Sequence, residues 1–106
     1  MNTIIEDIDS FNEINKNVKP VVGMGLTVLH NSGQSACTVI RVSKSGKTIW
    51  FQEDFSFGSN YNYTYEHNPD AMVKQARLHE SGIVKVFRFG LRAVLGFRET
   101  LYVPSK

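Results

Sequence analysis

The spacing of apolar residues changes near residue 20, and this change constrains the fold more than any other feature. From Val21 onward apolar side chains recur at every second position, as in Val22, Met24 and Leu26, which is the period of a β-strand with one buried face. Turn-forming sequences such as SKSGK at 43–47 and ESG at 80–82 separate these stretches. The pattern therefore predicts short antiparallel strands joined by tight turns.

The predicted strands cover most of the chain after residue 20. We expect a three-stranded meander over 21–55, a loop with a short strand over 56–70, and a last extended segment over 91–103 that bends at Gly96. Residues 71–79 fit either a helix that begins at Asn68-Pro69-Asp70 or a strand, and we favour the strand because it completes a hairpin with 83–89.

These strands predict a mainly β fold: a small antiparallel SH3-like barrel of about five or six strands with a short N-terminal helix. One domain is the expected number for 106 residues. The side chains expected largely inside the barrel are Leu26, Val28, Val39, Ile40, Ile49, Phe51, Val86, Phe87, Leu95 and Phe97.

The first 20 residues differ from the rest in period and in charge. Apolar residues recur at helical spacing over 3–15, Thr3 can cap the helix with Glu6 as its partner, and Pro20 ends the segment. We therefore divide the chain into an acidic amphipathic helix or arm at 1–20 and a β-barrel domain at 21–106. The helix can dock on the barrel, bind another molecule or remain partly disordered.

The net charge of +2 conceals a basic last third. Residues 71–106 carry seven bases and two acids, which can attract phosphate or an acidic protein, or can be the solvated face of strands.

Three tyrosines at alternating positions would project to one side of a strand, either as a binding platform or as a cover over the core. Together with three arginines they form the predicted binding surface: Tyr61, Tyr63, Tyr65, Arg88, Arg92 and Arg98. The alternative for Arg98 is a structural ion pair with an acid such as Glu66.

No set of residues in the sequence combines a nucleophile, a base and a stabilising group. Cys37 and His30 can meet across the first hairpin, but no motif supports a nucleophilic pair, and Glu53 and Asp54 are adjacent and would face opposite sides of a strand. The three histidines lack the spacing of metal ligands. We expect a protein that is not an enzyme and that needs neither metal nor cofactor.

Three segments, at 21–42, 61–70 (YNYTYEHNPD) and 95–105 (LGFRETLYVPS), resemble a group of small uncharacterised proteins encoded by bacteriophages and mobile elements. The matching positions are Gly23, Gly25, Thr27, Ser32, Thr38, Val39, Tyr63, Tyr65, Pro69, Gly96, Arg98, Tyr102 and Pro104. The chain departs from the group at Gly33 and Val103, where the group often has Asp. The resemblance implies a source and a fold but no activity.

These observations favour an accessory protein of phage type that binds a host protein or sequesters a small anionic ligand, and so inhibits host machinery or antiviral defence. A nucleic-acid-binding small β-barrel is the alternative, which the low net charge disfavours. The single cysteine and the lack of a signal peptide or a long apolar run predict a cytoplasmic protein without a membrane segment. A homo-oligomer is compatible with the sequence.

Overall fold

The computed structural model describes residues 8–30, 33–59, 62–96 and 101–102, which contain one helix and eight strands. In chain order these are α1 (Ile8–Lys16), β1 (Gly25–His30), β2 (Gly33–Val42), β3 (Thr48–Ser59), β4 (Asn62–His67), β5 (Lys74–Leu78), β6 (Val84–Val86), β7 (Arg92–Leu95) and β8 (Leu101–Tyr102).

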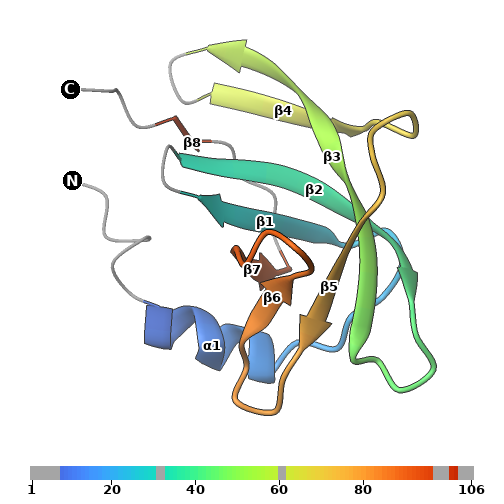
Figure 1. Ribbon diagram of the computed structural model, residues 1–106. Helices are drawn as coiled ribbons and strands as arrows, with labels where there is room; N and C mark the ends of the chain where they lie inside the picture. Colours follow the sequence, from blue (N-terminus) through green and yellow to red (C-terminus); the bar gives the residue numbers. More distant parts are fainter. Residues whose placement is uncertain (1–7, 31–32, 60–61, 97–100, 103–106) are drawn as a thin grey trace.

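Six of the strands form a closed barrel (Figure 1). Each of β1, β2, β3, β5, β6 and β7 pairs with the next in this order, and β7 pairs with β1 to close the barrel, always antiparallel. The other two strands extend the sheet, since β4 pairs with the far half of β3 and β8 with the start of β2. The predicted mainly β architecture, a small antiparallel barrel with a short helix before it, is confirmed.

The alternation along each strand places one apolar face inside the barrel. Leu26 of β1, Val39 of β2 and Phe51 of β3 are completely buried, and Leu95 of β7 closes the same core. The remaining buried members of this cluster are Val28, Cys37, Ile49, Ala76, Val84, Val86 and Ala93. Burial of these side chains is the main favourable contribution to folding.

Two of the expected core residues lie elsewhere. Phe87 is 61% exposed, because Val86 faces inward and its neighbour along the strand must project outward. Ile40 is only half-buried, since the pairing of β2 with β3 shifts register between Val39 and Arg41. Phe97 lies outside the described residues.

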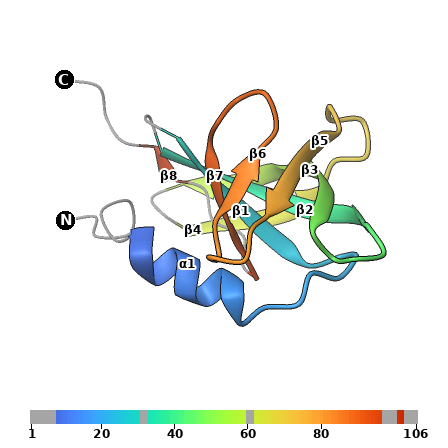
Figure 2. The same cartoon turned by 60° about the horizontal axis from the view of Figure 1, so that its bottom comes forward.

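Among the described side chains of α1, Asn15 is buried, and it contacts the barrel. The amide nitrogen of Asn15 donates a hydrogen bond to the carbonyl of Ala93 (3.0 Å), and its oxygen accepts one from the amide of Leu95 (2.8 Å). Asn15 thus pairs with an edge of β7 in the way that a neighbouring strand would. Figure 2 brings this end of the barrel forward and shows α1 in front of the strands. Thr3 and Glu6, the predicted helix cap, lie outside the described residues.

The segment after β3 is more regular than the sequence indicates. β3 continues to Ser59 instead of ending near Phe55, and β4 and β5 both pair with it. The strand predicted within 71–79 is confirmed as β5.

Gln52 holds the connection between β4 and β5. Its amide nitrogen donates to the carbonyls of Pro69 (2.9 Å) and Ala71 (2.8 Å), and its oxygen accepts a hydrogen bond from Nε2 of His67 (2.7 Å).

Candidate functional site

A row of cations crosses the outer face of the barrel. The strand register places Arg77 of β5 directly opposite Lys85 of β6, and Lys85 opposite Arg92 of β7. Their neighbours Ala76, Val86 and Ala93 are buried, so the three cationic residues lie on the outer face. Like charges directly opposite each other destabilise a sheet. This arrangement therefore costs stability unless an anion lies against it.

Aromatic residues form a second row beside the first, two positions away along the strands. Trp50 of β3 lies opposite Arg41 of β2 on one side and Gln75 of β5 on the other, and the amide of Phe87 donates to the carbonyl of Gln75 (2.7 Å). The Arg41 guanidinium lies 4.5 Å from the centre of the Trp50 ring, a cation–π contact. The outer face thus carries large rings next to the cations.

The turn between β6 and β7 adds two exposed phenylalanines. Phe87 and Phe89 are 61% and 55% exposed. A cation accompanies each ring: the Arg88 guanidinium lies 5.7 Å from the Phe87 ring and Lys74 Nζ lies 5.6 Å from the Phe89 ring. Arg88 has a φ of +74°, which is the only positive φ among the described residues other than glycine. Strain of this kind often occurs at binding sites.

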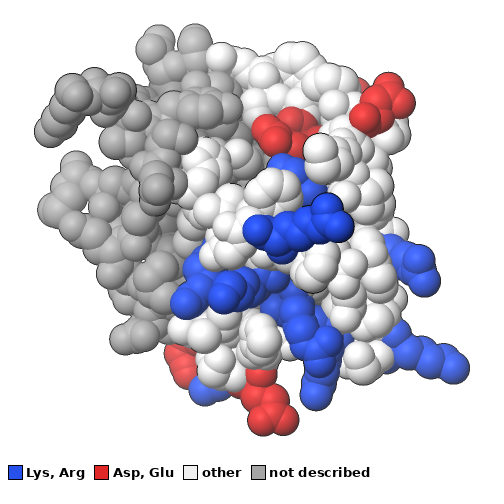
Figure 3. Space-filling view, viewed as in Figure 1, with Lys and Arg blue, Asp and Glu red and all other residues white. Residues whose placement is uncertain are grey.

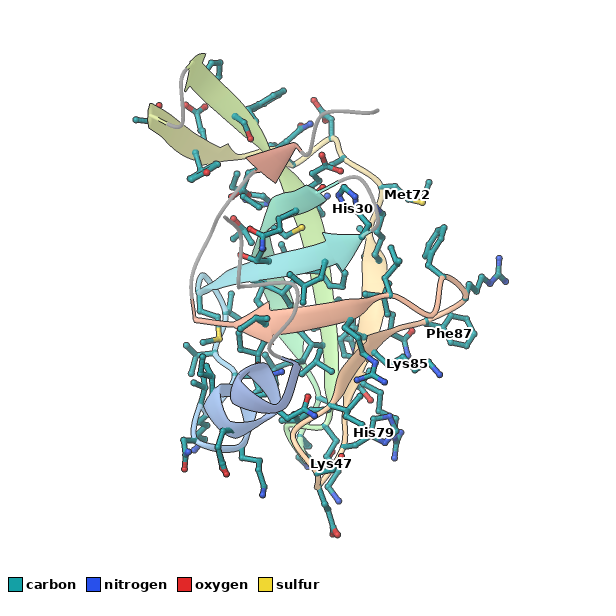
Figure 4. All side chains as sticks on the ribbon, turned by 90° about the vertical axis from the view of Figure 1, so that its left-hand side faces the viewer. His30, Lys47, Met72, His79, Lys85 and Phe87 are labelled. Carbon is teal, nitrogen blue, oxygen red and sulfur yellow. The ribbon has the colours of Figure 1, made fainter. Side chains whose placement is uncertain are left out.

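These residues together make one surface, the aromatic–basic face: Arg41, Trp50, Lys74, Arg77, Lys85, Phe87, Arg88, Phe89 and Arg92. Two adjoining hollows of about 550 and 400 Å³ open on it, and Gln75, Phe87 and Arg88 line both. No Asp or Glu of the described residues lines either hollow. Figure 3 shows the basic side chains gathered over β5 and β6, and Figure 4 shows Lys85 and Phe87 projecting outward on the same side.

Only part of the predicted binding surface is found on this face. Arg88 and Arg92 belong to it. Tyr65 pairs with Ser56 of β3, whereas Arg77 of the cationic row pairs with Thr48 of the same strand. Ser56 and Thr48 are eight residues apart, which corresponds to about 26 Å along the strand at about 3.3 Å per residue. The structure therefore does not bring Tyr65 together with Arg92, the predicted arginine of this row.

The other three predicted residues cannot be placed on the face. Tyr61 and Arg98 lie outside the described residues, and of Tyr63 only the backbone, opposite Gly58, is described. The rings beside the cations are instead Trp50, Phe87 and Phe89. The alternation in IVKVFRF at 83–89 could have indicated an outward Phe87 once Val84 and Val86 were assigned to the core.

Cys37 is not a nucleophile in this fold. Its side chain is buried in the core, and burial, with smaller contributions from the charges of Glu53 and Asp54, raises the pKa of the thiol to about 12. The reactive thiolate is therefore absent at neutral pH. His30, the suggested partner, is hydrogen-bonded through Nε2 to Ser35 Oγ at 2.8 Å.

The carboxylates considered for acid–base chemistry are separated as expected. Glu53 is exposed, whereas Asp54 is buried on the opposite side of β3 and accepts a hydrogen bond from Thr38 Oγ1 (2.6 Å). Within the described part of the chain, no group of three or more His, Cys, Asp or Glu side chains is arranged to hold a metal ion.

Comparisons with family models, with curated proteins and with solved structures find no match to this chain. Within the residues that the structure describes, no helix is long and apolar enough to cross a membrane.

Proposed function

We propose that the protein binds single-stranded nucleic acid on the aromatic–basic face. The observation that carries this proposal is the row of directly opposed cations, Arg77, Lys85 and Arg92, beside the exposed rings of Phe87 and Phe89. A basic surface that follows the phosphates, together with rings on which bases stack, is the usual way in which small barrels bind single strands.

The cations and the rings would contact different parts of the nucleic acid. Arg77 and Lys85 are exposed, and no Asp or Glu that the structure describes lies with them in the lining of the larger hollow, so their charge is available to phosphates. Phe87 and Phe89 offer ring surface to bases. Bases in a duplex are stacked on each other, so exposed rings favour a single strand.

The net charge of +2, which disfavours nucleic acid at the level of the sequence, is a poor guide here. Binding responds to the local field, and the hollows on the aromatic–basic face are lined by cations without a described carboxylate. Of the two acidic residues of α1, Asp9 and Glu13, Glu13 lies with Oε1 3.8 Å from Lys16 Nζ. Its charge is therefore partly compensated away from this face.

A protein partner is the second candidate, because exposed aliphatic side chains adjoin the rings. Met72 and Val73 are 69% and 52% exposed and line the smaller hollow with Phe87 and Phe89. Aromatic residues, Met and Arg are enriched in protein interfaces. An acidic host protein with apolar anchor residues would fit, in a cytoplasmic, phage-type setting as the sequence resemblance implies.

Fluorescence anisotropy with a labelled oligothymidylate of about ten nucleotides tests the proposal. We expect Phe87→Ala to weaken binding about tenfold, because one stacked base contributes about 1–3 kcal/mol. Phe57→Ala is the matched control, since Phe57 is also about half exposed but lies on the far half of β3; we expect it to leave the affinity unchanged.

Two results would overturn the nucleic-acid proposal. One is no binding of the oligonucleotide at low salt, and the other is an equal loss of affinity in both variants. A protein partner would be supported instead if the wild type bound an acidic, Leu-rich peptide but no oligonucleotide. Phe87→Ala should then abolish the binding of the peptide.

A further inference from the structure

A separate hollow of about 540 Å³ lies at the end of the barrel next to α1. Three segments that are distant in the sequence form its walls: the end of α1 with the residues that follow it, the turn between β2 and β3, and the turn between β5 and β6. Figure 4 shows Lys47 and His79 at this end of the molecule, below Lys85. The volume is within the usual range for small-molecule sites.

The rim of this end hollow is strongly basic. Lys16 and Lys19 come from the helix side, and Lys44 and Lys47 from the turn between β2 and β3. Among the described residues Lys16 is paired with Glu13 (3.8 Å), and no ion pair is formed by the other three lysines. Glu80 is the one carboxylate among the described residues of the lining. The lining therefore has an excess of positive charge that favours an anionic occupant.

The walls between the lysines are apolar. Pro20 is buried, and Val42 and Leu78 are partly buried against the barrel core and also line the end hollow. A ligand that fills the hollow would therefore place an apolar or flat part against these side chains and its charges against the rim.

The turn that carries Lys44 and Lys47 has a fixed backbone. Ser43 Oγ accepts a hydrogen bond from the amide of Thr48 (3.0 Å), and the amide of Gly46 donates to the carbonyl of Ser43 (2.9 Å). The amide of Leu78, the last residue of β5, donates to the carbonyl of Lys47 (2.7 Å) and so connects this turn to β5. Little ordering of the backbone is then needed when a ligand binds, which favours affinity.

We infer that the end hollow binds a small molecule that carries two or more phosphate groups and a flat or apolar part, as a nucleoside triphosphate does. The lysines would bind the phosphates, and Pro20, Val42 and Leu78 would contact the ring. The end hollow contains no residue of the aromatic–basic face, and among the described residues it shares only His79 with the larger hollow that opens on that face. It does not depend on the nucleic-acid proposal.

Isothermal titration calorimetry with ATP, tripolyphosphate and adenosine tests the inference. We expect ATP to bind more tightly than tripolyphosphate, and adenosine to bind weakly or not at all. The double substitution Lys44→Ala and Lys47→Ala should weaken ATP binding at least tenfold. Lys74→Ala removes a cation from the aromatic–basic face and should leave ATP binding within twofold of the wild type.

The outcomes that overturn the inference are specific. They are no ATP binding at about 1 mM, an unchanged affinity in the Lys44/Lys47 double variant with wild-type circular dichroism, or equal affinities for ATP and tripolyphosphate. If the phosphates of a bound oligonucleotide entered the end hollow, ATP and the oligonucleotide would compete. Displacement of the oligonucleotide by one equivalent of ATP would therefore contradict a separate site. Failure of oligonucleotide binding with intact ATP binding would contradict the nucleic-acid proposal alone.

Discussion

At Arg88 the backbone conformation is unfavourable for stability, whereas the side chain belongs to the proposed binding surface. Its φ of +74° is unfavourable for a side chain with a Cβ atom, by about 1–2 kcal/mol. We expect Arg88→Gly to raise the free energy of unfolding by up to about 1 kcal/mol, because glycine relieves the strain but loses more backbone entropy on folding. The same change should weaken oligonucleotide binding severalfold by removing a cation.

Urea denaturation and anisotropy on the same preparation check this prediction. A variant that is less stable than the wild type would show that the contact of Arg88 with Phe87 outweighs the backbone strain. A variant that binds as tightly as the wild type would remove Arg88 from the binding surface.

Cys37 provides a prediction on pH dependence. The folded protein holds the thiol pKa at about 12, against an ordinary value of 9.0, so the folded state retains a proton that the unfolded state loses. The stability that Cys37 contributes is therefore fully present below about pH 9 and falls as the pH rises toward 12. We expect the stability advantage of the wild type over Cys37→Ala to shrink by about 2 kcal/mol between pH 7 and pH 10.5.

Denaturation of both proteins across this pH range measures the effect. Reaction with iodoacetamide should be slow in the folded wild type and fast in urea. A pH-independent difference between the two proteins, or rapid labelling of the folded state, would contradict a buried thiol.

Phe87 shows what can and cannot be predicted from single residues. Strict alternation fixes which neighbours share a face, so Val86 and Phe87 could not both be internal, and the sequence contained this information. The sequence alone could not predict which aromatic rings lie beside the arginines. Trp50 and Phe87 are brought together by the pairing of β3 with β5 and of β5 with β6.

At the scale of elements, the contact between α1 and the turn after β5 is very close. A Cβ atom on Gly82 would collide with the backbone oxygen of Asn12 and lie 2.8 Å from Lys16 Cγ, and the φ of Gly82 is +93°. We expect Gly82→Ala to lower the free energy of unfolding by more than about 3 kcal/mol, since overpacking adds to backbone strain.

Gly46→Ala is the matched control for Gly82→Ala. Gly46 has a φ of +77° in the turn between β2 and β3, but beyond its chain neighbours no atom of the described residues lies within 4 Å of an added Cβ. Gly46→Ala should lower the free energy of unfolding by only about 1 kcal/mol, because it adds backbone strain but no collision. If urea denaturation shows the same loss of unfolding free energy for Gly82→Ala and Gly46→Ala, α1 does not pack closely against the turn after β5.

The elements themselves were largely predictable from local patterns. Period-two alternation indicated the meander and the strand at β5, and the glycine at 96 marked a bend that the structure shows with a φ of +100°. The register was not predictable, because it depends on contacts between distant segments. Without register, the opposition of Arg77, Lys85 and Arg92 cannot be derived from the sequence.

At the scale of the whole molecule, the distribution of charge matters more than its sum. A net charge of +2 describes a nearly neutral chain. The fold separates the signs locally, so that basic side chains line the hollows of the outer face and the rim of the end hollow. The two binding sites that we propose both rest on this separation of charge.

The salt dependence of oligonucleotide binding tests the central claim most directly. Each phosphate contact to a single strand contributes about −0.7 to the slope of log K against log salt concentration. We predict that the Arg77→Ala and Lys85→Ala double variant has a slope shallower than the wild type by about 1.4. The Lys44→Ala and Lys47→Ala double variant, which removes the same charge from the end hollow, should keep the wild-type slope. Parallel slopes for the wild type and the Arg77/Lys85 variant would contradict the assignment of this face to nucleic acid.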